Sequence, residues 1–475
     1  MATAEASPPS SSSSGARVLA FVCTLSMITY LDRACFGMAL RPIAGELGLA
    51  DASQLKWAVT AFAIAYAAFE VPAGAMGDRL GAKAMLTRIV VWWSACTALT
   101  GLIGLRVGGL MLGGVGTLVL LRFLFGAGEA GAYPNITRAL HDRLPPRRWE
   151  TAQGLVFMSG RLAGGLTPLL WAVLVGGTAT SSPWITWRGA FLLFGAIGVI
   201  WAVAFRTGFP DHPDDVEGRD APSHPATHAA VPWKALATNR TLWALCIMYL
   251  AVNYAWAFNL SYLPTYVEQR FGVGAEDRVG AVYKGAPLWV GAAGCLLGGP
   301  AVGGLARLLG DRRRARRVLG MSSLSLGAAC WWGAARAEDV HLYCTLVALA
   351  AFSIDLTLGA CWASCQDLGR GHAALVAACM NTVGTLGNAL AGWLTGTLVE
   401  GSIAAKAQAL RVPPPALSEV DGRIAALAGY ESAFGTYVMA FALAAACWLF
   451  IDPGRGLAPE GRGAEPLTSD EDRRT

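Results

Sequence analysis

Long apolar runs recur along the whole chain and leave little polar sequence between them. Hydrophobic residues make up 54% of the 475 residues, and charged residues make up only 15%. A soluble protein of this length needs more polar surface to cover its core, and a helix needs about 20 apolar residues to cross a bilayer. The runs therefore predict an all-α membrane protein with about twelve transmembrane helices.

The expected spans are residues 17–38, 57–77, 85–105, 112–138, 151–175, 189–206, 240–266, 281–306, 317–335, 339–364, 373–399 and 430–451. A segment rich in Pro, Asp and His, 208–238, follows the sixth span and is expected to be a solvated cytoplasmic linker. It divides the chain into two six-helix halves, 17–207 and 239–452. The Ser- and Pro-rich start, 1–16, lacks the organisation of a signal peptide, and it and 453–475 are expected to be disordered tails.

Basic residues are unevenly distributed between the loops. With the N-terminus inside, the inner loops hold two basic groups and the block "RRRARR" at 312–317; the groups are Arg79, Lys83 and Arg88, and Arg138, Arg143, Arg147 and Arg148. The outer loops hold Arg106 and Arg188 singly. This asymmetry predicts that both termini are cytoplasmic. The net charge of +5 therefore reflects membrane topology, and we expect no nucleic-acid partner.

Nothing in the sequence indicates an enzyme or a cofactor. The eleven cysteines lie almost all in apolar runs, and no histidine clusters with Cys361 and Cys365, so we expect buried thiols and no metal site. We find no catalytic triad and no nucleotide-binding loop. Energy for any transport would come from ion gradients across the bilayer. Short loops and the lack of organelle signals favour a bacterial inner membrane, and we expect a monomer.

The loop after the second span reads "GAMGDRLGAK", residues 74–83. Its glycines allow close backbone approach, and its charged residues lie at a helix end. This loop resembles the signature of the major facilitator superfamily, which implies two six-helix halves around a central cavity. The resemblance implies a gating loop that latches the halves together, formed by Gly74, Asp78, Arg79, Gly81 and Lys83. The weaker copy at 303–317 has Arg307 where the family has Asp, which puts a symmetric latch in doubt.

Four further stretches are similar to the anion:cation symporter family, the branch with sugar-acid permeases and sialin. They are "ITYLDRACFG" (28–37), "LLRFLFGAGEAGAYPN" (120–135), "WRGAFLLFGAIGVIWA" (187–202) and "CMNTVGTLGNALAGWLTG" (379–396). The resemblance extends over nearly the whole chain. It implies transport of an organic anion together with a cation.

Four of the charges in these stretches lie within expected spans. Span one holds Asp32 and Arg33, and span four holds Arg122 and Glu129, which share a helix face. Each charge at mid-membrane costs roughly 2.5–3.5 kcal/mol, so it should face a partner or a wet cavity. An arriving carboxylate can bind an arginine. The displaced buried acid, whose pKa rises without its counter-charge, can then take up a proton.

The family resemblance implies the same roles. Arg33 and Arg122 would bind the anion, and Asp32 and Glu129 would couple it to protons. Three polar residues would contribute further substrate contacts, namely Tyr30, Tyr66 and Asn381. The charges could instead be structural pairs that fix helix packing, and the three polar residues could serve packing alone.

Other polar residues within the spans leave alternatives open. Arg161 could be a third anion contact or a partner for Glu70, which is also a candidate for gating. Asp355 could be a coupling site or a satisfied polar contact. In span seven, Tyr254, Phe258, Tyr262 and Asn259 could pack or line the cavity. No Lys or Arg follows Arg240, the first residue of that span, which argues against the glutamate-carrier branch.

The sequence therefore predicts proton-coupled symport of a small organic anion, a sugar acid or similar monocarboxylate, by alternating access. One alternative is a facilitator or exchanger for phosphate or an aromatic acid. Another is a membrane receptor that binds the anion without moving it. The gating loop argues against a receptor, because a latch is useful only in a protein that moves.

Overall fold

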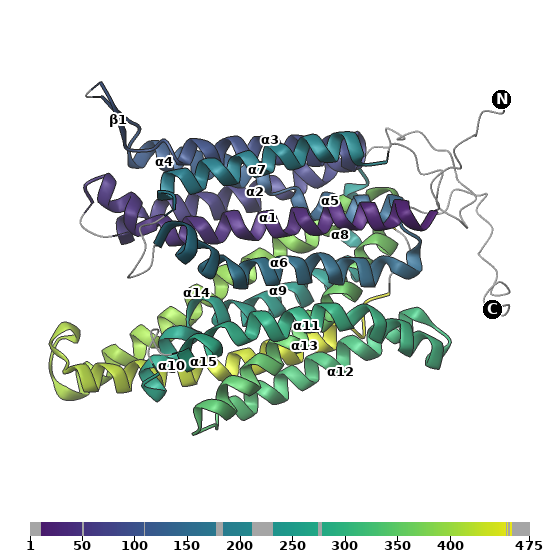
Figure 1. The fold of residues 1–475 in the computed structure, drawn as a ribbon. Coiled ribbons are helices and arrows are strands. Elements are labelled where there is room, and N and C mark those ends of the chain that lie inside the picture. Colours follow the sequence, from purple (N-terminus) through teal and green to yellow (C-terminus); the bar gives the residue numbers. More distant parts are fainter. Residues whose placement is uncertain are drawn as a thin grey trace, which may run out of the picture.

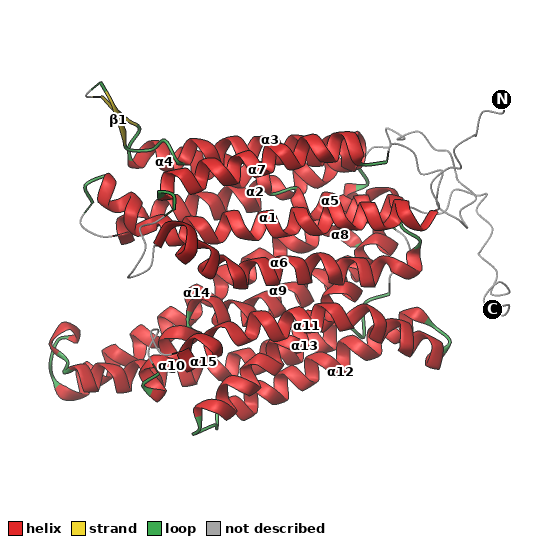
Figure 2. Ribbon diagram, in the orientation of Figure 1, coloured by secondary structure: helices red, strands yellow, loops and turns green. Residues whose placement is uncertain are grey.

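The computed structural model describes residues 11–49, 52–108, 110–176, 184–210, 231–273, 278–452, 454 and 457. Long helices account for nearly all of these residues, and they form one elongated bundle (Figures 1 and 2). The only strands in the described part of the chain, β1 (Leu105–Val107) and β2 (Leu110–Leu112), pair antiparallel as a small hairpin. The predicted all-α membrane fold is confirmed.

The first half of the chain forms the helices that lie uppermost in Figure 1. They are α1 (Ser11–Glu46), α2 (Lys56–Leu80), α3 (Ala82–Thr100), α4 (Val115–Glu129), α5 (Ala132–Arg143), α6 (Trp149–Trp171) and α7 (Trp187–Gly208). Short turns of helix lie between them, η1 (Ala52–Leu55), η2 (Pro146–Arg148) and η3 (Ala172–Gly176). The expected fourth span is present as α4 and α5, which are interrupted only at residues 130–131.

The second half forms the lower helices. They are α8 (Trp233–Thr238), α9 (Arg240–Ser261), α10 (Leu263–Phe271), α11 (Arg278–Leu309), α12 (Arg312–Ala334), α13 (Val340–Gly369), α14 (Ala373–Leu410) and α15 (Glu419–Cys447), with the turns η4 (Arg370–His372) and η5 (Pro414–Ala416). The expected seventh span is split into α9 and α10, where Pro264 opens the second helix. Each expected span thus corresponds to a helix or to a pair of helices.

Several expected boundaries were wrong. Helix α1 begins at Ser11, within the expected tail 1–16, and α8 occupies the end of the expected linker 208–238. Most of that linker, and almost all of 453–475, lie outside the described residues. Helices α14 and α15 continue toward each other beyond the expected limits 399 and 430, and project from one end of the bundle (Figure 1).

Within the described part of the chain, eight helical stretches are long and apolar enough to cross a membrane, and one of them, Val340–Leu410, contains both α13 and α14. Helix α12, which opens with an arginine run, is not among them. Glycines let the helices of the second half approach closely. A Cβ on Gly387 would lie 2.2 Å from the carbonyl oxygen of Leu250, and one on Gly298 would lie 2.3 Å from that of Leu356. Such small-residue contacts are typical of helix packing in membranes.

The two halves meet along α2 and α14, and along α6 with α11 and α13. We call the end of the bundle where α1 begins and α15 ends the terminal end (Figure 1). The basic residues of the predicted inner loops lie at or near this end, because each follows or precedes a helix that starts or stops there, whereas Arg106 in β1 lies at the opposite end. Which side of the membrane this end faces stays a prediction.

Candidate functional site

A cavity of about 600 Å³ lies between the two halves, at mid-length of the helices. Five of the six residues predicted to bind substrate line it, and they are Tyr30, Arg33, Tyr66, Arg161 and Asn381. The sixth, Arg122, does not. Residues that the sequence reasoning had not selected complete much of the polar and aromatic wall, namely Tyr133, Phe157, Tyr249, Asn253, Trp256, Trp362, Thr385 and Asn388.

Arg33 is held at the cavity wall by a carboxylate from another helix. Its Nε donates to Oε1 of Glu129 at 2.9 Å, and the Glu129 side chain is completely buried. The guanidinium carbon lies 4.8 Å from the ring centre of Tyr66, a cation–π distance. Nη2 of Arg33 and Oε2 of Glu129 have no hydrogen-bond partner within the described chain. The ion pair between Arg33 and Glu129 therefore joins α1 to α4 and leaves Nη2 of Arg33 without a hydrogen-bond acceptor in the described chain.

Arg122 lies behind the cavity wall. Its guanidinium carbon is 4.0 Å from the ring centre of Phe36, 4.8 Å from that of Phe62 and 4.7 Å from that of Phe125. The residue is only 6% exposed, and its Nε has no hydrogen-bond partner among the described residues. Arg122 is thus caged by aromatic rings, and a substrate in this cavity would not touch it directly.

Asp32 immediately precedes Arg33 in the chain and is buried. Its side chain leaves the helix about 100° around the axis from that of Arg33, as for any two neighbouring helical residues. Neither of its carboxylate oxygens has a hydrogen-bond partner in the described structure. An unpaired carboxylate charge is costly to bury, so these surroundings suit a carboxyl that can hold a proton. A coupling role for Asp32 stays a prediction.

Arg161 on α6 is joined to Asp355 on α13, so the alternative in which Glu70 is its partner is wrong. Nε and Nη2 of Arg161 donate to the two carboxylate oxygens of Asp355 at 3.0 and 2.9 Å. Nη1 donates to the hydroxyl of Tyr30 at 3.3 Å, and the ring of Trp256 lies 3.7 Å from the guanidinium carbon. This bidentate ion pair connects the two halves at the cavity.

Glu70 makes a second connection between the halves. Its buried carboxylate accepts a short hydrogen bond from the side-chain amide of Asn381, and a bond from the hydroxyl of Thr382 at 3.1 Å. Both partners lie on α14. Asn381 therefore lines the cavity and also fixes α2 to α14.

The aromatic residues singled out in span seven serve packing. Phe258 is completely buried against Trp331, Phe434 and Tyr437, and the hydroxyl of Tyr254 bonds that of Thr436 at 2.6 Å. The cavity is lined instead by the residues next to this stripe, Asn253, Trp256 and Ala257. The reading in which the stripe itself lines the cavity is wrong, because the helix is rotated to present its neighbours.

The gating loop joins the halves at the terminal end. Asp78, at the end of α2, accepts bonds from the backbone N–H groups of Ala374 (3.1 Å) and Leu375 (2.9 Å), in the first turn of α14. Nη1 of Arg138 donates to the same carboxylate at 3.1 Å. A carboxylate at a helix N-terminus is favoured both by the free N–H groups and by the helix dipole.

The other loop residues support this contact. A Cβ on Gly74 would lie 2.7 Å from that of Ala378, so α2 and α14 approach closely only because Gly74 has none. Gly81 adopts φ +82 between α2 and α3, a left-handed value that favours glycine. Lys83 donates to the carbonyl of Phe209 at 2.8 Å, and Arg79 is exposed.

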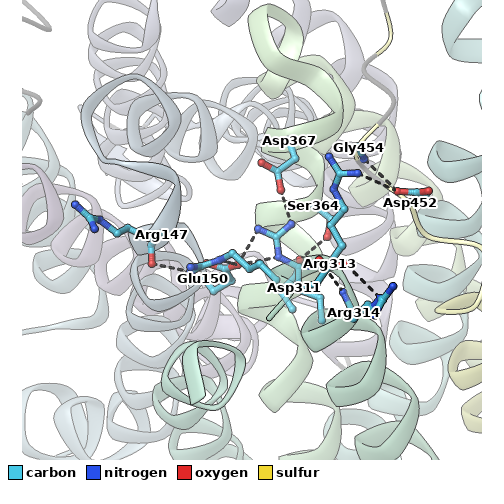
Figure 3. Close-up of polar contacts among 12 residues, drawn as sticks. Arg147, Glu150, Asp311, Arg313, Arg314, Ser364, Asp367, Asp452 and Gly454 are labelled. Carbon is cyan, nitrogen blue, oxygen red and sulfur yellow. Dashed lines mark hydrogen bonds and ion pairs between the residues drawn. The ribbon is translucent and has the colours of Figure 1, made fainter. Parts of the chain in front are cut away.

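A second ionic contact between the halves lies at the same end, and the sequence reasoning missed it. Glu150, in the first turn of α6, is completely buried and binds two arginines of α12 (Figure 3). Nε of Arg312 lies 2.8 Å from Oε1 of Glu150, and Nε of Arg316 lies 2.7 Å from it. Arg316 also makes a short bond to Asp367. In this contact the first half provides the carboxylate and the second half provides the arginines. Arg307, which stands at the Asp position of the weaker loop copy, is exposed.

The Major Facilitator Superfamily family model matches residues 22–392. Among curated relatives, the chain is 29% identical to a probable sulfoacetate transporter of Cupriavidus necator, over 77% of this chain and 83% of that protein. It is 27% identical to a hexuronate transporter of Bacillus subtilis (80% and 88% covered), and 25% identical to a probable L-galactonate transporter of Escherichia coli (76% and 77% covered).

Solved structures share the fold. The proton:xylose symporter XylE, bound to 6-bromo-6-deoxy-D-glucose, aligns with a TM-score of 0.69 at 14% identity, over 93% of this chain and 96% of that one. A bacterial homologue of the human lysosomal transporter Spinster, in an inward-facing state, aligns with a TM-score of 0.61 at 20% identity, over 94% and 98%.

Proposed function

This chain belongs to the Major Facilitator Superfamily, and we propose that it is a secondary active transporter that carries a small organic anion together with protons. The relatives named above are transporters of organic anions, and none of them is an enzyme. The substrates for which these relatives are named, hexuronates, L-galactonate and sulfoacetate, favour a small acid such as a sugar acid.

The observation that carries this proposal is Arg33. It lines a cavity between the two halves, 33% of its side-chain surface is exposed, and its bond to Glu129 uses only one of its five N–H donors. A guanidinium binds a carboxylate through parallel N–H groups, and such charge-assisted bonds are strong. The cavity also offers hydroxyl and amide groups suited to a hydroxylated acid, from Tyr30, Tyr66, Asn253 and Asn388.

Two buried carboxylates support proton coupling. Glu129 shares Arg33 with any anion that binds there, so the arriving anion weakens its pairing and favours its protonation. Neither carboxylate oxygen of Asp32 has a hydrogen-bond partner among the described residues, and Asp32 is the second carboxyl that can hold a proton. In this scheme Arg122, in its aromatic cage, supplies positive charge behind the site and does not contact the substrate.

The latches at the terminal end support a carrier that is closed on that side in this state. Asp78 and Glu150 each join one half to the other there, whereas the cavity lies farther along the same helices. We place this end in the cytoplasm because the basic loops lie on it. The membrane is expected to be a bacterial inner membrane, and opening these latches would expose the cavity to the cytoplasm.

Uptake into liposomes that contain a pH dye tests the proposal. With an acidic exterior and a panel of sugar acids, we expect substrate entry with acidification of the lumen. Arg33→Ala should abolish both signals, because a lost charged contact of roughly 1.5–3 kcal/mol lowers affinity about 10- to 150-fold. The control is Arg336→Ala, which removes an exposed arginine outside the cavity and should leave uptake unchanged.

Other results would support the alternatives. Entry of an anion without acidification indicates a facilitator or an exchanger, for which phosphate and aromatic acids belong in the panel. Saturable binding by folded protein without entry indicates a receptor. Loss of uptake in Arg336→Ala as large as that in Arg33→Ala would remove the assignment of the anion to Arg33.

A further inference from the structure

Two arginines in the cavity wall are held in the same way. The first is Arg33, whose Nε is anchored by completely buried Glu129 and whose guanidinium lies over the ring of Tyr66. The pair with Glu129 uses only Nε, Arg33 lines the cavity, and 33% of its side-chain surface is exposed. The carboxylate lies behind the arginine, and the aromatic ring keeps the guanidinium plane in position.

Arg161, on α6 of the same half, repeats this arrangement with a second buried carboxylate. Nε and Nη2 are anchored by Asp355, which is completely buried, and the guanidinium lies over the ring of Trp256. Nη1 is left over and is directed to the hydroxyl of Tyr30. A guanidinium has five N–H donors, so the pair with Asp355 does not exhaust it.

Arg161 is bonded to a residue of α1 that lies about one helical turn from Arg33. Tyr30, which accepts the bond from Arg161, is three residues before Arg33, and three residues of helix rise about 4.5 Å. Tyr30, Arg33 and Arg161 all line the one cavity. A single small molecule in this cavity can therefore reach both arginines.

We propose that Arg33 and Arg161 form two anion subsites of one binding site, and that the carrier prefers a short acid with an anionic group at each end. One end of this dianion binds Arg33, and the other binds Nη1 of Arg161 and the hydroxyl of Tyr30. The inference rests on the proposed transport function and narrows its substrate class. A monoanion fills only one of the two subsites.

Matched pairs of acids test the preference. Gluconate and glucarate share a hydroxylated six-carbon chain and differ in the second terminal carboxylate, and butyrate and succinate form a shorter pair. Uptake into liposomes and the ligand-induced rise in melting temperature are measured for each acid. We expect the dianion of at least one pair to show an apparent affinity roughly 10- to 100-fold higher than its monoanion, the effect of one charged contact.

The double variant Arg161→Gln with Asp355→Asn removes both charges of the buried pair, because removal of one alone would leave the other unpaired. It should lose the preference for the dianion and change the affinity for the monoanion less than about twofold, since the Arg33 subsite remains. Tyr30→Phe removes only the hydroxyl that contacts Arg161, and should weaken dianion binding roughly two- to tenfold. This second variant provides the test if the double variant does not fold.

Equal affinity for dianion and monoanion in the wild type, with uptake of the monoanion intact, would overturn this inference and leave the proposed function standing. The same conclusion follows if both acids of a pair are weakened equally by the variants. If folded wild type neither binds nor carries any of the four acids, the proposed function fails together with the inference.

Discussion

The contact of Asp78 with the start of α14 predicts a measurable shift between two states of the carrier. Replacing Asp78 with Asn keeps the shape of the side chain but removes the charge that accepts bonds from Arg138, Ala374 and Leu375. Hydrogen bonds to a charged group contribute roughly 1.5–3 kcal/mol each, and the amide oxygen of Asn replaces part of them. We therefore expect the closed terminal end to lose about 2–4 kcal/mol relative to the open one.

A loss of this size changes the ratio of the two states roughly 30- to 1,000-fold. An open state populated at about 1% in the wild type would then rise to at least about a fifth of the molecules. Distances between spin labels report this ratio. Labels at Arg88→Cys on α3 and Arg314→Cys on α12 lie on exposed positions of opposite halves near the terminal end. The half-buried Cys23 and Cys379 are replaced with Ser, and the other nine native cysteines are buried.

Asp142→Asn is the matched control. Asp142 also accepts a bond from Arg138, at 2.8 Å, but both residues lie on α5 in the same half. Its loss should leave the distance distribution unchanged. A distribution in Asp78→Asn that matches the wild type, or an equal shift in the control, would refute the idea that the contact with α14 closes this end.

Three further outcomes follow from the same structure. Glu150→Gln leaves two arginines of α12 without their carboxylate and should lower the free energy of unfolding by roughly 3–5 kcal/mol. The melting temperature of the variant measures this loss. An unchanged melting temperature would mean that the cluster does not stabilise the fold. Gly74→Ala should populate the open terminal end in the spin-label experiment, because its Cβ would collide with α14, whereas Gly37→Ala, with nothing within 4 Å, should not. Asp32→Asn should keep exchange of labelled for unlabelled substrate but lose accumulation driven by a pH gradient, and accumulation at the wild-type level would exclude Asp32 from coupling.

The apolar runs predicted the spans well, because the hydrocarbon core requires about 20 apolar residues wherever a helix crosses it. The same signal failed at the ends of α14 and α15. These helices continue into polar sequence, where Lys406 and Asp421 pair at 3.3 Å, and apolarity reports the bilayer rather than the helix. Helix bounds outside the membrane depend on local caps and tertiary contacts that the runs do not record.

The identity of the site residues was easier to predict than their pairing. Charges in apolar runs mark Arg33, Glu129, Arg161 and Asp355 without any structure. Which charge meets which depends on the rotation of each helix about its axis and on the neighbour it faces. Arg161 and Asp355 are separated by 194 residues, and no local spacing relates them. The cage around Arg122 likewise depends on three phenyl rings brought together by packing.

The gating loop and the Glu150 contact show that the sequence can identify a latch residue without identifying its partners. The sequence of the loop marked Asp78 as a latch residue, but the donors that Asp78 binds across the halves are the backbone N–H groups of Ala374 and Leu375, which any residue except proline supplies. Glu150 carried no motif, and the arginines that bind it were interpreted as a topology signal and as part of a weak copy of the loop, without a carboxylate partner. A latch made with backbone groups or with an ordinary arginine run leaves little trace in sequence.

The two latches also bear on how such a protein evolves. Each lies at the start of the fifth span of one half, α14 in one case and α6 in the other, but the charges are assigned in opposite ways. After an ancestral duplication, selection could preserve the attraction between the halves while the acidic partner moved from loop to helix in one copy. In such a family the attraction between the halves is conserved rather than the residues that provide it. A half that no longer matches the sequence motif can therefore still form a latch.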